Sequence, residues 1–188
     1  MEALLGIALG IGLAAAAGLR VFVPVFGAGL AAHFGALSLN QGFAWVATLP
    51  ALVAFGTATI LEIGAYYVPW LDHALDVAAT PTAVAAGILS SAAVITDLPP
   101  LLTWTIAIVL GGGAAGIMQL LSVATRIKSA VTTGGLGNPV VATAETAGSI
   151  AVSALAIAVP AVALLILAVV AVWLVRRRQR RAVQRASR

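Results

Sequence analysis

The sequence predicts an all-α fold, a polytopic transmembrane helical bundle of about five membrane segments. Of the 188 residues, 62% are hydrophobic and only 9% are charged, and the mean hydropathy is +1.11. A soluble domain normally carries about a quarter charged residues. This much apolar surface cannot be buried in one core, so lipid must be the solvent for much of it.

The charges are distributed unevenly, and this predicts the domain organisation. Seven of the ten Lys and Arg residues are arginines within residues 176–188, which leaves three cations and six carboxylates, a formal charge of −3, in the rest of the chain. A basic tail directly after an apolar helix anchors that end on the cytoplasmic side. We expect one transmembrane domain over residues 1–175, a disordered cytoplasmic tail over 176–188, and a multi-pass location in the cell inner (plasma) membrane.

Composition also limits the function classes. The chain has no cysteine, which excludes disulfides, thiol catalysis and Cys-based metal sites. His33 and His73 lack Ser or Cys partners at motif spacing, so we expect no enzyme, no cofactor and no metal. No aromatic residues interleave with the tail arginines, so nucleic acid is not an expected partner. The expected partners are membrane lipids, a small polar solute or ion, and further copies of the chain.

The first apolar stretch, from Ala3 to about Phe34, is predicted to be a broken membrane segment. It begins with Glu2 and has no Lys or Arg at its start, unlike a signal peptide, so we expect it to be retained. A simple span needs only about 20 residues, and Pro24 predicts a break or kink. Gly6 and Gly10 have the spacing that lets two membrane helices approach closely.

Arg20 lies inside this segment, just before the predicted break. An Arg at the centre of a membrane helix costs about 2.5–3.5 kcal/mol on insertion scales, so it must find a partner or water. One interpretation is structural, with the guanidinium bonded to carbonyls freed by Pro24. The other is functional, and the sequence favours neither.

A second span is predicted from Phe43 to about Val68, with Trp45 and Tyr66 among the aromatic residues at its two ends. Glu62 lies inside this span, and carboxylates within membranes are candidates for function by default. The alternatives are a side chain that reaches the interface, or one that pairs with Arg20.

The next stretch, residues 69–81, places Asp72 and Asp76 four residues apart, on one face of a helix. Like charges at this spacing repel mildly, so they prefer water, a shared proton or a cation. A solvated interfacial helix is the favoured interpretation. The apolar residues 82–95 that follow are short and predict a marginal span or a half-helix.

Two further apolar runs complete the count of five. A span is predicted from Leu101 to about Ala124, in which Gly112 and Gly116 repeat the close-packing spacing. Residues 139–175 would form about 55 Å of helix, more than a bilayer core needs. This run either kinks at Pro160 or, as we favour, begins outside the lipid in a protein-lined cavity.

Five segments and a cytoplasmic tail place the amino terminus outside. The regions 72–76 and 126–138 then also fall outside. Arg126 and Lys128 lie in the second of these regions. Their place outside conflicts with the positive-inside rule, by which Lys and Arg are enriched in cytoplasmic loops.

The most polar stretch of the chain, Arg126 to Glu145, contains a Gly-rich turn. Asn138 is suited to cap the helix that follows, and a helix start with nearby cations favours anions. We expect a re-entrant or cavity-lining turn that binds a polar solute or an anionic head group. The alternative is an exposed loop before a well-capped helix. The phosphate-loop spacing is absent, so no nucleotide site is expected.

Two pairs of fragments predict an inverted repeat. Residues 16–19 (AAGL) resemble 114–117 (AAGI), and residues 58–62 (ATILE) resemble 142–145 (ATAE) with one residue deleted. The segments concerned run in opposite directions in the predicted topology. Inverted repeats with interrupted helices are typical of secondary transporters, although matches this short also arise by chance.

These residues carry a resemblance to a known family. Gly18-Leu-Arg20 with Pro24, Glu62 followed by Pro69-Trp-Leu-Asp72 and Asp76, and Arg126 with Thr133-Gly-Gly-Leu-Gly-Asn-Pro139 and Glu145 resemble the uncharacterised bacterial membrane family "domain of unknown function 4126". The resemblance covers roughly residues 5–160, and the Gly-rich turn with its flanking Arg and Glu is its most specific part. It implies a small all-helical membrane protein and no particular activity.

The leading hypothesis is a small transporter or channel-like protein, oligomeric, that moves a small polar solute or ion. The candidate substrate- or ion-binding residues are Arg20, Glu62, Asp72, Asp76, Arg126, Thr133, Gly134, Gly135, Asn138 and Glu145. The alternative is a non-transporting lipid-binding or scaffold protein that engages anionic lipids through the Gly-rich turn and the basic tail.

Overall fold

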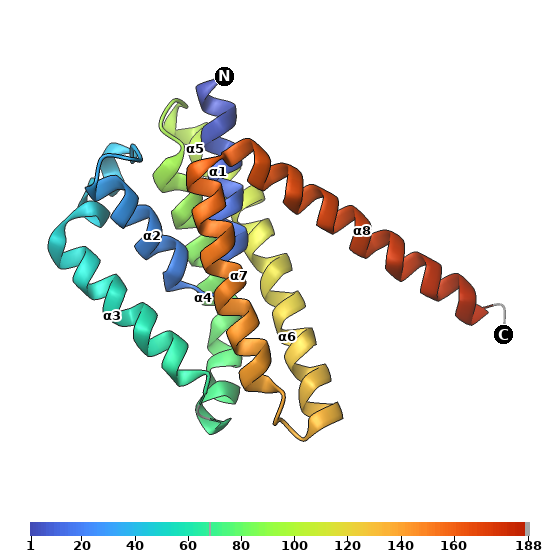
Figure 1. The fold of residues 1–188 in the computed structure, drawn as a ribbon. Coiled ribbons are helices and arrows are strands. Elements are labelled where there is room, and N and C mark those ends of the chain that lie inside the picture. Colours follow the sequence, from blue (N-terminus) through green and yellow to red (C-terminus); the bar gives the residue numbers. More distant parts are fainter. Residues whose placement is uncertain (68, 187–188) are drawn as a thin grey trace.

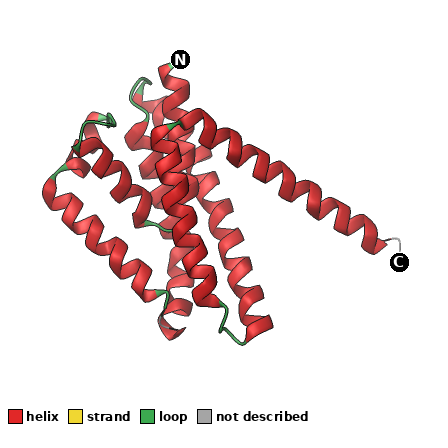
Figure 2. Ribbon diagram, in the orientation of Figure 1, coloured by secondary structure: helices red, strands yellow, loops and turns green. Residues whose placement is uncertain are grey.

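The computed structural model describes residues 1–67 and 69–186, with the side chains of residues 69–78, 171, 174, 175 and 177–186 excepted. All secondary structure in the described part is helical (Figure 2). The side chains of Asp72 and Asp76 lie outside the described part. The predicted role of this pair therefore stays a prediction.

The first segment is a hairpin of two half-helices. α1 (Glu2–Ala17) and α2 (Phe22–His33) are joined by residues 18–21. α1 runs from the amino terminus into the middle of the bundle, and α2 turns back toward the same end (Figure 1). The predicted break is confirmed, but it precedes Pro24. That proline lies in the first turn of α2, where its missing N–H needs no partner within the helix.

The predicted second span is also divided. The short 3₁₀-helix η1 (Gln41–Ala47) and α3 (Leu49–Ala65) are bent by 69° relative to one another. Trp45 thus belongs to η1, at the end of the bundle that carries the amino terminus (Figure 1). α3 then runs to the opposite end and packs against α2.

α4 (Pro69–Val94) is one helix of 26 residues that continues through Pro81. The prediction of an interfacial helix followed by a separate half-helix was therefore wrong. A proline inside a helix costs about 3 kcal/mol. The close packing of α4 against α1, in which Ala83 is fully buried, offsets that cost.

The following helix is longer than predicted. α5 (Pro100–Ile106), the π-helical η2 (Ala107–Gly112) and α6 (Gly113–Thr133) form one 34-residue helix. It continues past the predicted end near Ala124, so Arg126 and Lys128 are helical rather than in a loop. α7 (Asn138–Ala158) returns, and α8 (Pro160–Ala186) leaves the bundle after a break at Val159. The break before Pro160 matches the alternative that was not favoured, and the favoured one, a helix that begins outside the lipid in a protein-lined cavity, stays a prediction.

α1 is the centre of the bundle and packs against α4, α6, α7 and α8. A Cβ atom added to Gly10 would lie 3.2 Å from Ser91 Cα of α4, and one added to Gly6 would lie 3.3 Å from the Val94 carbonyl oxygen. Gly112 and Gly116 face the same helix from η2 and α6. The close approach predicted from both glycine pairs is confirmed.

Among the described residues, two helices are long and apolar enough to cross a membrane: Pro100–Thr133 and Asn138–Ala158. A third is added if η1 and α3 count as one bent span. Shorter apolar helices are Glu2–Ala17, Phe22–His33, Ala79–Val94 and Pro160–Val170. These helices indicate a membrane protein, as composition predicted.

Candidate functional site

The tip of the α1–α2 hairpin places Arg20 in the middle of the bundle. Gly18 lets the tip lie against α6, because a Cβ atom there would be only 2.6 Å from Met118 Cβ. The backbone N–H groups of Leu19 and Arg20 both donate to the Ala16 carbonyl oxygen at 3.0 Å, which turns the chain at the end of α1. The side chain of Arg20 is 1% exposed.

The Arg20 guanidinium is bound entirely by protein groups of α7 and its own turn. Its Nη2 donates to the Ala142 carbonyl oxygen at 2.8 Å, and its Nε donates to Thr146 Oγ1 at 3.0 Å. Its Nη1 donates to Glu145 Oε2 at 3.2 Å. Arg20 thus has a carboxylate partner as well as carbonyls, but these are the carbonyls of Ala142 and Leu19 rather than carbonyls freed by Pro24. The functional interpretation stays a prediction.

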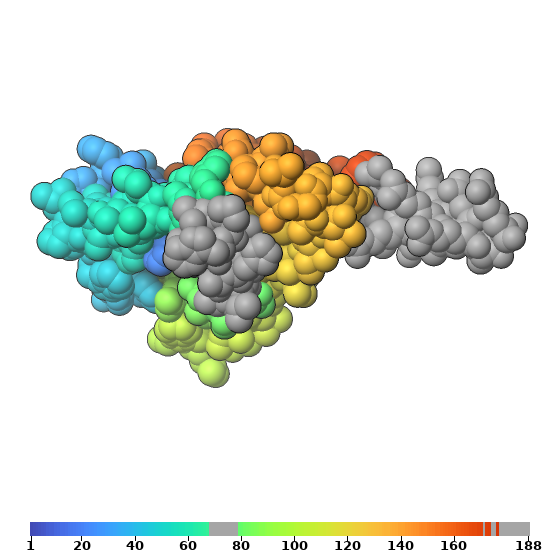
Figure 3. Space-filling view, turned by 90° about the horizontal axis from the view of Figure 1, so that it is seen from below, coloured from blue at the N-terminus to red at the C-terminus, as the bar shows by residue number. Residues whose placement is uncertain are grey.

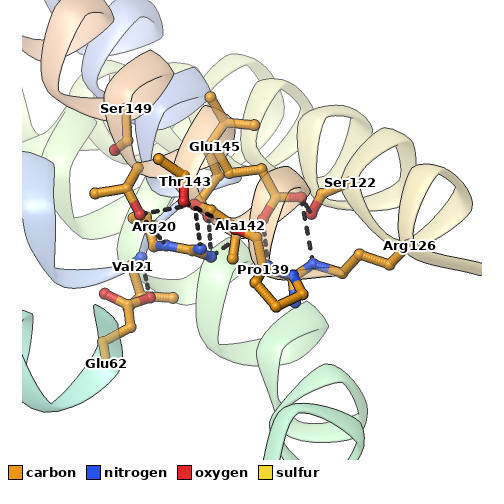
Figure 4. A network of polar contacts seen from close by, with 12 residues as sticks. Arg20, Val21, Glu62, Ser122, Arg126, Pro139, Ala142, Thr143, Glu145 and Ser149 are labelled. Carbon is orange, nitrogen blue, oxygen red and sulfur yellow. Dashed lines mark hydrogen bonds and ion pairs between the residues drawn. The ribbon is translucent and has the colours of Figure 1, made fainter. Parts of the chain in front are cut away.

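Glu145 joins the two buried arginines. Arg126 of α6 reaches both carboxylate oxygens, with Nε 3.3 Å from Oε1 and Nη2 bonded to Oε2. Ser122, one turn earlier on α6, donates its hydroxyl to Oε1. Charged, bidentate contacts of this kind are among the strongest hydrogen bonds in proteins. A single carboxylate therefore fixes α1, α6 and α7 to one another (Figure 4).

Tyr66 closes this cluster at the end of α3. The Cζ atoms of Arg20 and Arg126 lie 4.1 and 4.0 Å from the centroid of its ring. An aromatic face attracts cations most when it is desolvated, and Tyr66 is buried. The ring thereby lowers the cost of holding two cations close together. Hereafter Arg20, Tyr66, Ser122, Arg126 and Glu145 are called the arginine cluster.

Glu62 holds the start of α2 rather than serving as the carboxylate that joins the arginines. Its Oε1 accepts the backbone N–H of Val21 at 2.7 Å, and its Oε2 accepts that of Phe22 at 3.0 Å. The first N–H groups of a helix have no partner within the helix and carry a partial positive charge. Glu62 supplies the anion that this terminus attracts, directly beside Arg20 (Figure 4).

A groove of about 370 Å³ between α6 and α7 leads to the cluster. It is lined by Glu145, Ser122 and Thr125, together with Leu19 of the hairpin tip and apolar residues of α6 and α7. The carboxylate is only 7% exposed. The groove therefore makes the buried carboxylate accessible from one side of the bundle.

The structure brings four of the predicted site residues together: Arg20, Glu62, Arg126 and Glu145. Their formal charges cancel, since two are cations and two are carboxylates. These residues come from distant parts of the sequence and lie close together (Figure 4). Of the four, only Glu145 lines the groove, so their shared role in binding a solute stays a prediction.

The Gly-rich turn lies apart from this group. Thr133, Gly134 and Leu136 are exposed, and the turn links the ends of α6 and α7 at one end of the bundle (Figures 1 and 3). Gly134 and Gly135 have φ values of 64° and 91°, which only glycine adopts readily. Thr133 Oγ1 accepts the Gly137 N–H at 2.9 Å and stabilises the turn. The described geometry is that of an exposed helix–helix connection, whereas the buried break in the helices is at residues 18–21.

Asn138 is buried as the first residue of α7, and Gly137 precedes the helix as its cap residue. The predicted helix start is thus placed within one residue of its position in the structure. His33 is the last residue of α2, where its Nδ1 lies 2.8 Å from the Ala47 carbonyl oxygen.

Sequence reasoning missed Tyr66, Ser122 and Thr146 as site residues. The sequence carried a signal for Ser122, because Gln119, Ser122 and Arg126 recur at helical spacing. In the structure all three are buried on α6. α7 carries a similar stripe, in which Ser149 Oγ donates to the Ala16 carbonyl oxygen at 3.0 Å. Polar side chains on one face of an apolar helix indicate a helix that faces protein.

Groups of three or more His, Cys, Asp or Glu that could hold a metal ion are not found in the described part of the chain. The chemistry that remains is ionic. Two guanidinium groups, two carboxylates and a helix terminus can bind a small charged solute or exchange a proton.

A comparison of the sequence with models of protein families identifies the family of this chain. The family described as Domain of unknown function (DUF4126) matches residues 7–180. The chain belongs to this family. Its DUF4126 membership agrees with the resemblance carried by the sequence and assigns no activity. No curated protein and no solved structure is significantly similar to the chain.

Proposed function

We propose that this DUF4126 protein is a small membrane transporter or channel-like protein that moves a small polar solute or ion past the arginine cluster. The observation that carries the proposal is the placement of four ionisable side chains beneath the tip of a re-entrant helix pair. Ionisable groups inside membranes are expensive and mark solute or proton pathways. Broken helices whose ends meet within the bundle are typical of secondary transporters.

The groove between α6 and α7 supports a route to the cluster. It reaches Glu145 between α6 and α7, and Leu19 of the hairpin tip contributes to its lining. A mobile carboxylate is the simplest gate, because Glu145 holds both arginines when ionised and releases them when a solute or proton takes its place. In the same way, ionised Glu62 holds the first backbone N–H groups of α2 and would release them when a solute or proton takes its place.

An inverted repeat remains part of the proposal. Glu62 and Glu145 lie on α3 and α7, which run in opposite directions (Figure 1), and both side chains lie near Arg20 (Figure 4). The two halves differ at the other matched fragment. Residues 16–19 end α1, whereas residues 114–117 lie within the unbroken α6.

The re-entrant pair changes the proposed topology. Because α1 and α2 together do not cross the bundle, we place five crossings in α3, α4, α5–α6, α7 and α8. The α3–α4 and α6–α7 connections lie at one end, and the amino terminus lies at the other (Figure 1). With the arginine tail cytoplasmic, Lys128 and the Gly-rich turn are then cytoplasmic as well. This removes the conflict with the positive-inside rule.

The lipid-binding or scaffold alternative is less well supported. Arg126, which flanks the Gly-rich turn in the sequence, is 2% exposed and bonded to Glu145, so it does not add its charge to the exposed turn. Lys128, the exposed turn and the basic tail are what that hypothesis retains. We further propose a location in the inner membrane, assembly with further copies of the chain, and no enzymatic activity.

Flux through reconstituted vesicles tests the proposal. Vesicles that contain a pH-sensitive dye are given a pH gradient and a potassium diffusion potential, with chloride or phosphate as the anion. The wild-type chain is expected to dissipate the gradient faster than empty vesicles, and Glu62→Gln is expected to reduce that rate at least tenfold. Glu2→Gln is the matched control, because Glu2 is exposed at the start of α1. Equal rates for Glu62→Gln and Glu2→Gln, or no flux by the wild-type chain, would count against the proposal.

A further inference from the structure

A second cavity lies on the other side of α2, away from the groove. It has a volume of about 260 Å³ and is enclosed by α2, α3, α4, η1 and the connection before η1. α2 contributes Phe22, Val25 and Ala28, which lie on one face at helical spacing. Apart from Thr82 and Ser90 of α4, its lining is apolar or aromatic. We call this cavity the apolar slot.

The length of the slot matches one leaflet of a bilayer. Along α4 it extends from Thr82 to Ala93, which is about 16 Å at ~1.5 Å per residue. The hydrocarbon core of a bilayer is about 30 Å thick, so one leaflet is about half of that. The upper end of the slot lies at η1, and its lower end at Val21 and Phe22 reaches the hairpin tip in the middle of the bundle.

The upper end of the slot has the character of a membrane interface. Trp45 of η1 lines the slot and is 55% exposed, and tryptophan prefers the level of the lipid head groups. Leu89 lines the slot from α4 and is 48% exposed. The slot is thus open to its surroundings along α4 and near Trp45, where a lipid can enter sideways.

One polar group in the slot needs a ligand. Ser90 is 5% exposed, and its hydroxyl has no hydrogen-bond partner among the described residues. A buried hydroxyl without a partner is costly. Ser90 lies about one turn below the end of α4 at Val94. An ester carbonyl at the edge of the hydrocarbon region would lie at this depth and could accept its proton.

We propose that the apolar slot holds one acyl chain of a membrane phospholipid, with the ester carbonyl accepting a hydrogen bond from Ser90. The head group then lies beside η1, and the chain end lies against Val21 and Phe22. Below Ser90 the slot extends to Thr82, about 12 Å along α4 at ~1.5 Å per residue, so it encloses most of the length of a chain in one leaflet. This site is separate from the arginine cluster, and the inference does not depend on the proposed transport function.

Quenching of Trp45 fluorescence tests the site. Trp70, Trp104 and Trp173 are replaced by Phe, and the protein in detergent is titrated with a phospholipid that carries bromine atoms on one chain. Quenching is expected to saturate near one lipid per protein, and bromines near the ester end are expected to quench more than bromines near the methyl end. Quenching that grows without saturation would mean ordinary surrounding lipid only and would overturn the site.

Two variants with one matched control sharpen the test. Ala85 lines the slot and is exposed, so Ala85→Phe fills the slot without crowding the core and should raise the apparent Kd at least tenfold. Ala151→Phe, at an exposed position of α7 outside the slot, should leave the Kd unchanged. Equal affinities in these two variants would overturn the proposal.

Ser90→Ala removes one oxygen atom and tests the ester contact by itself. The wild-type slot should bind a diester lipid about two- to tenfold more tightly than the matching diether lipid, which lacks the carbonyl. Ser90→Ala should lose this preference while still binding both lipids. A preference that persists in Ser90→Ala would overturn the placement of the ester at Ser90.

Discussion

Two interruptions of helical structure, at Gly18–Val21 and at Gly134–Gly137, differ in almost every respect. The first is buried in the middle of the bundle, and its neighbours Arg20 and Glu62 are bound by α7 and by the start of α2. The second is an exposed connection at the end of the bundle, with Thr133 supporting its backbone. Backbone polar groups deep in a membrane protein must be satisfied internally, whereas those at its end can use water.

This difference shows that the most polar stretch of a sequence need not be the site itself. The turn was predicted to be the site because its glycines lie close to two cations in the sequence. Its flanking residues Arg126 and Glu145 do belong to the site, but they reach it from within α6 and α7. The turn contributes by pairing these helices so that the two side chains meet.

The largest expected effect comes from the carboxylate that joins the arginines. Glu145→Gln leaves two buried cations without their shared anion, which should lower the free energy of unfolding by about 3–5 kcal/mol. The measurement is denaturant unfolding in detergent, followed by circular dichroism. Glu2→Gln provides the control and should not change the midpoint. If the two variants unfold at the same denaturant concentration, the cluster does not hold the bundle together.

A second prediction concerns the buried break. Gly18→Ala places a methyl group 2.6 Å from Met118 Cβ, and overpacking of this kind costs about 1–3 kcal/mol. Gly113→Ala is the matched control on α6, where no atom lies within 4 Å of the new methyl group. It should stabilise by up to about 1 kcal/mol, because alanine favours a helix over glycine. Thermal unfolding of both variants should therefore shift in opposite directions, and a shift in the same direction would contradict the packing described here.

A smaller effect is expected at the exposed turn. Gly135 has a φ of 91° with open space around it, so Gly135→Ala should cost about 1 kcal/mol from backbone strain alone. Vesicle flux should stay within twofold of wild type, because the turn does not line the groove. Gly64→Ala, which also meets open space but at a helical position, should not destabilise the protein. A loss of flux in Gly135→Ala with intact folding would return the functional site to the turn.

Much of the fold was predictable from residue spacing. The broken first segment and the close-packing glycine pairs follow from the sequence, whereas the break before Pro160 was one of two alternatives and not the favoured one. The position of the first break did not follow, because a proline near a helix start is harmless and the break arises from the contact between Gly18 and α6. At Pro81 the sequence predicted a break that the structure does not have, because the packing of α4 against α1 stabilises a continuous helix there.

The site was predictable in its charged members and not in their pairing. Arg20 and Glu145 are 125 residues apart in the chain, and only the packing of α1 against α7 shows that they meet. The apolar run ends near Ala124, which predicted that Arg126 lies in a loop. α6 nevertheless continues to Thr133, because one face of its polar end is buried against the bundle. Tyr66 was interpreted as an interfacial residue, and its role depends on two cations that converge from other helices.

In the proposed mechanism, a solute reaches the arginine cluster through the groove between α6 and α7. Because the chain has no cysteine, single cysteines can be labelled without background. Thr125 lines the groove, whereas Thr132 lies about two turns further along α6 beside the turn. Both are exposed, and both hydroxyls donate to the carbonyl four residues earlier, at 2.8 and 2.9 Å.

The decisive measurement is flux through vesicles before and after a charged, membrane-impermeant thiol reagent reacts with Thr125→Cys or Thr132→Cys. Modification of Thr125→Cys is expected to stop flux. Modification of Thr132→Cys is expected to proceed to completion and leave flux unchanged. If Thr125→Cys is fully modified and flux continues, or if it stays unreactive while Thr132→Cys reacts, then the groove is not the route to the arginine cluster.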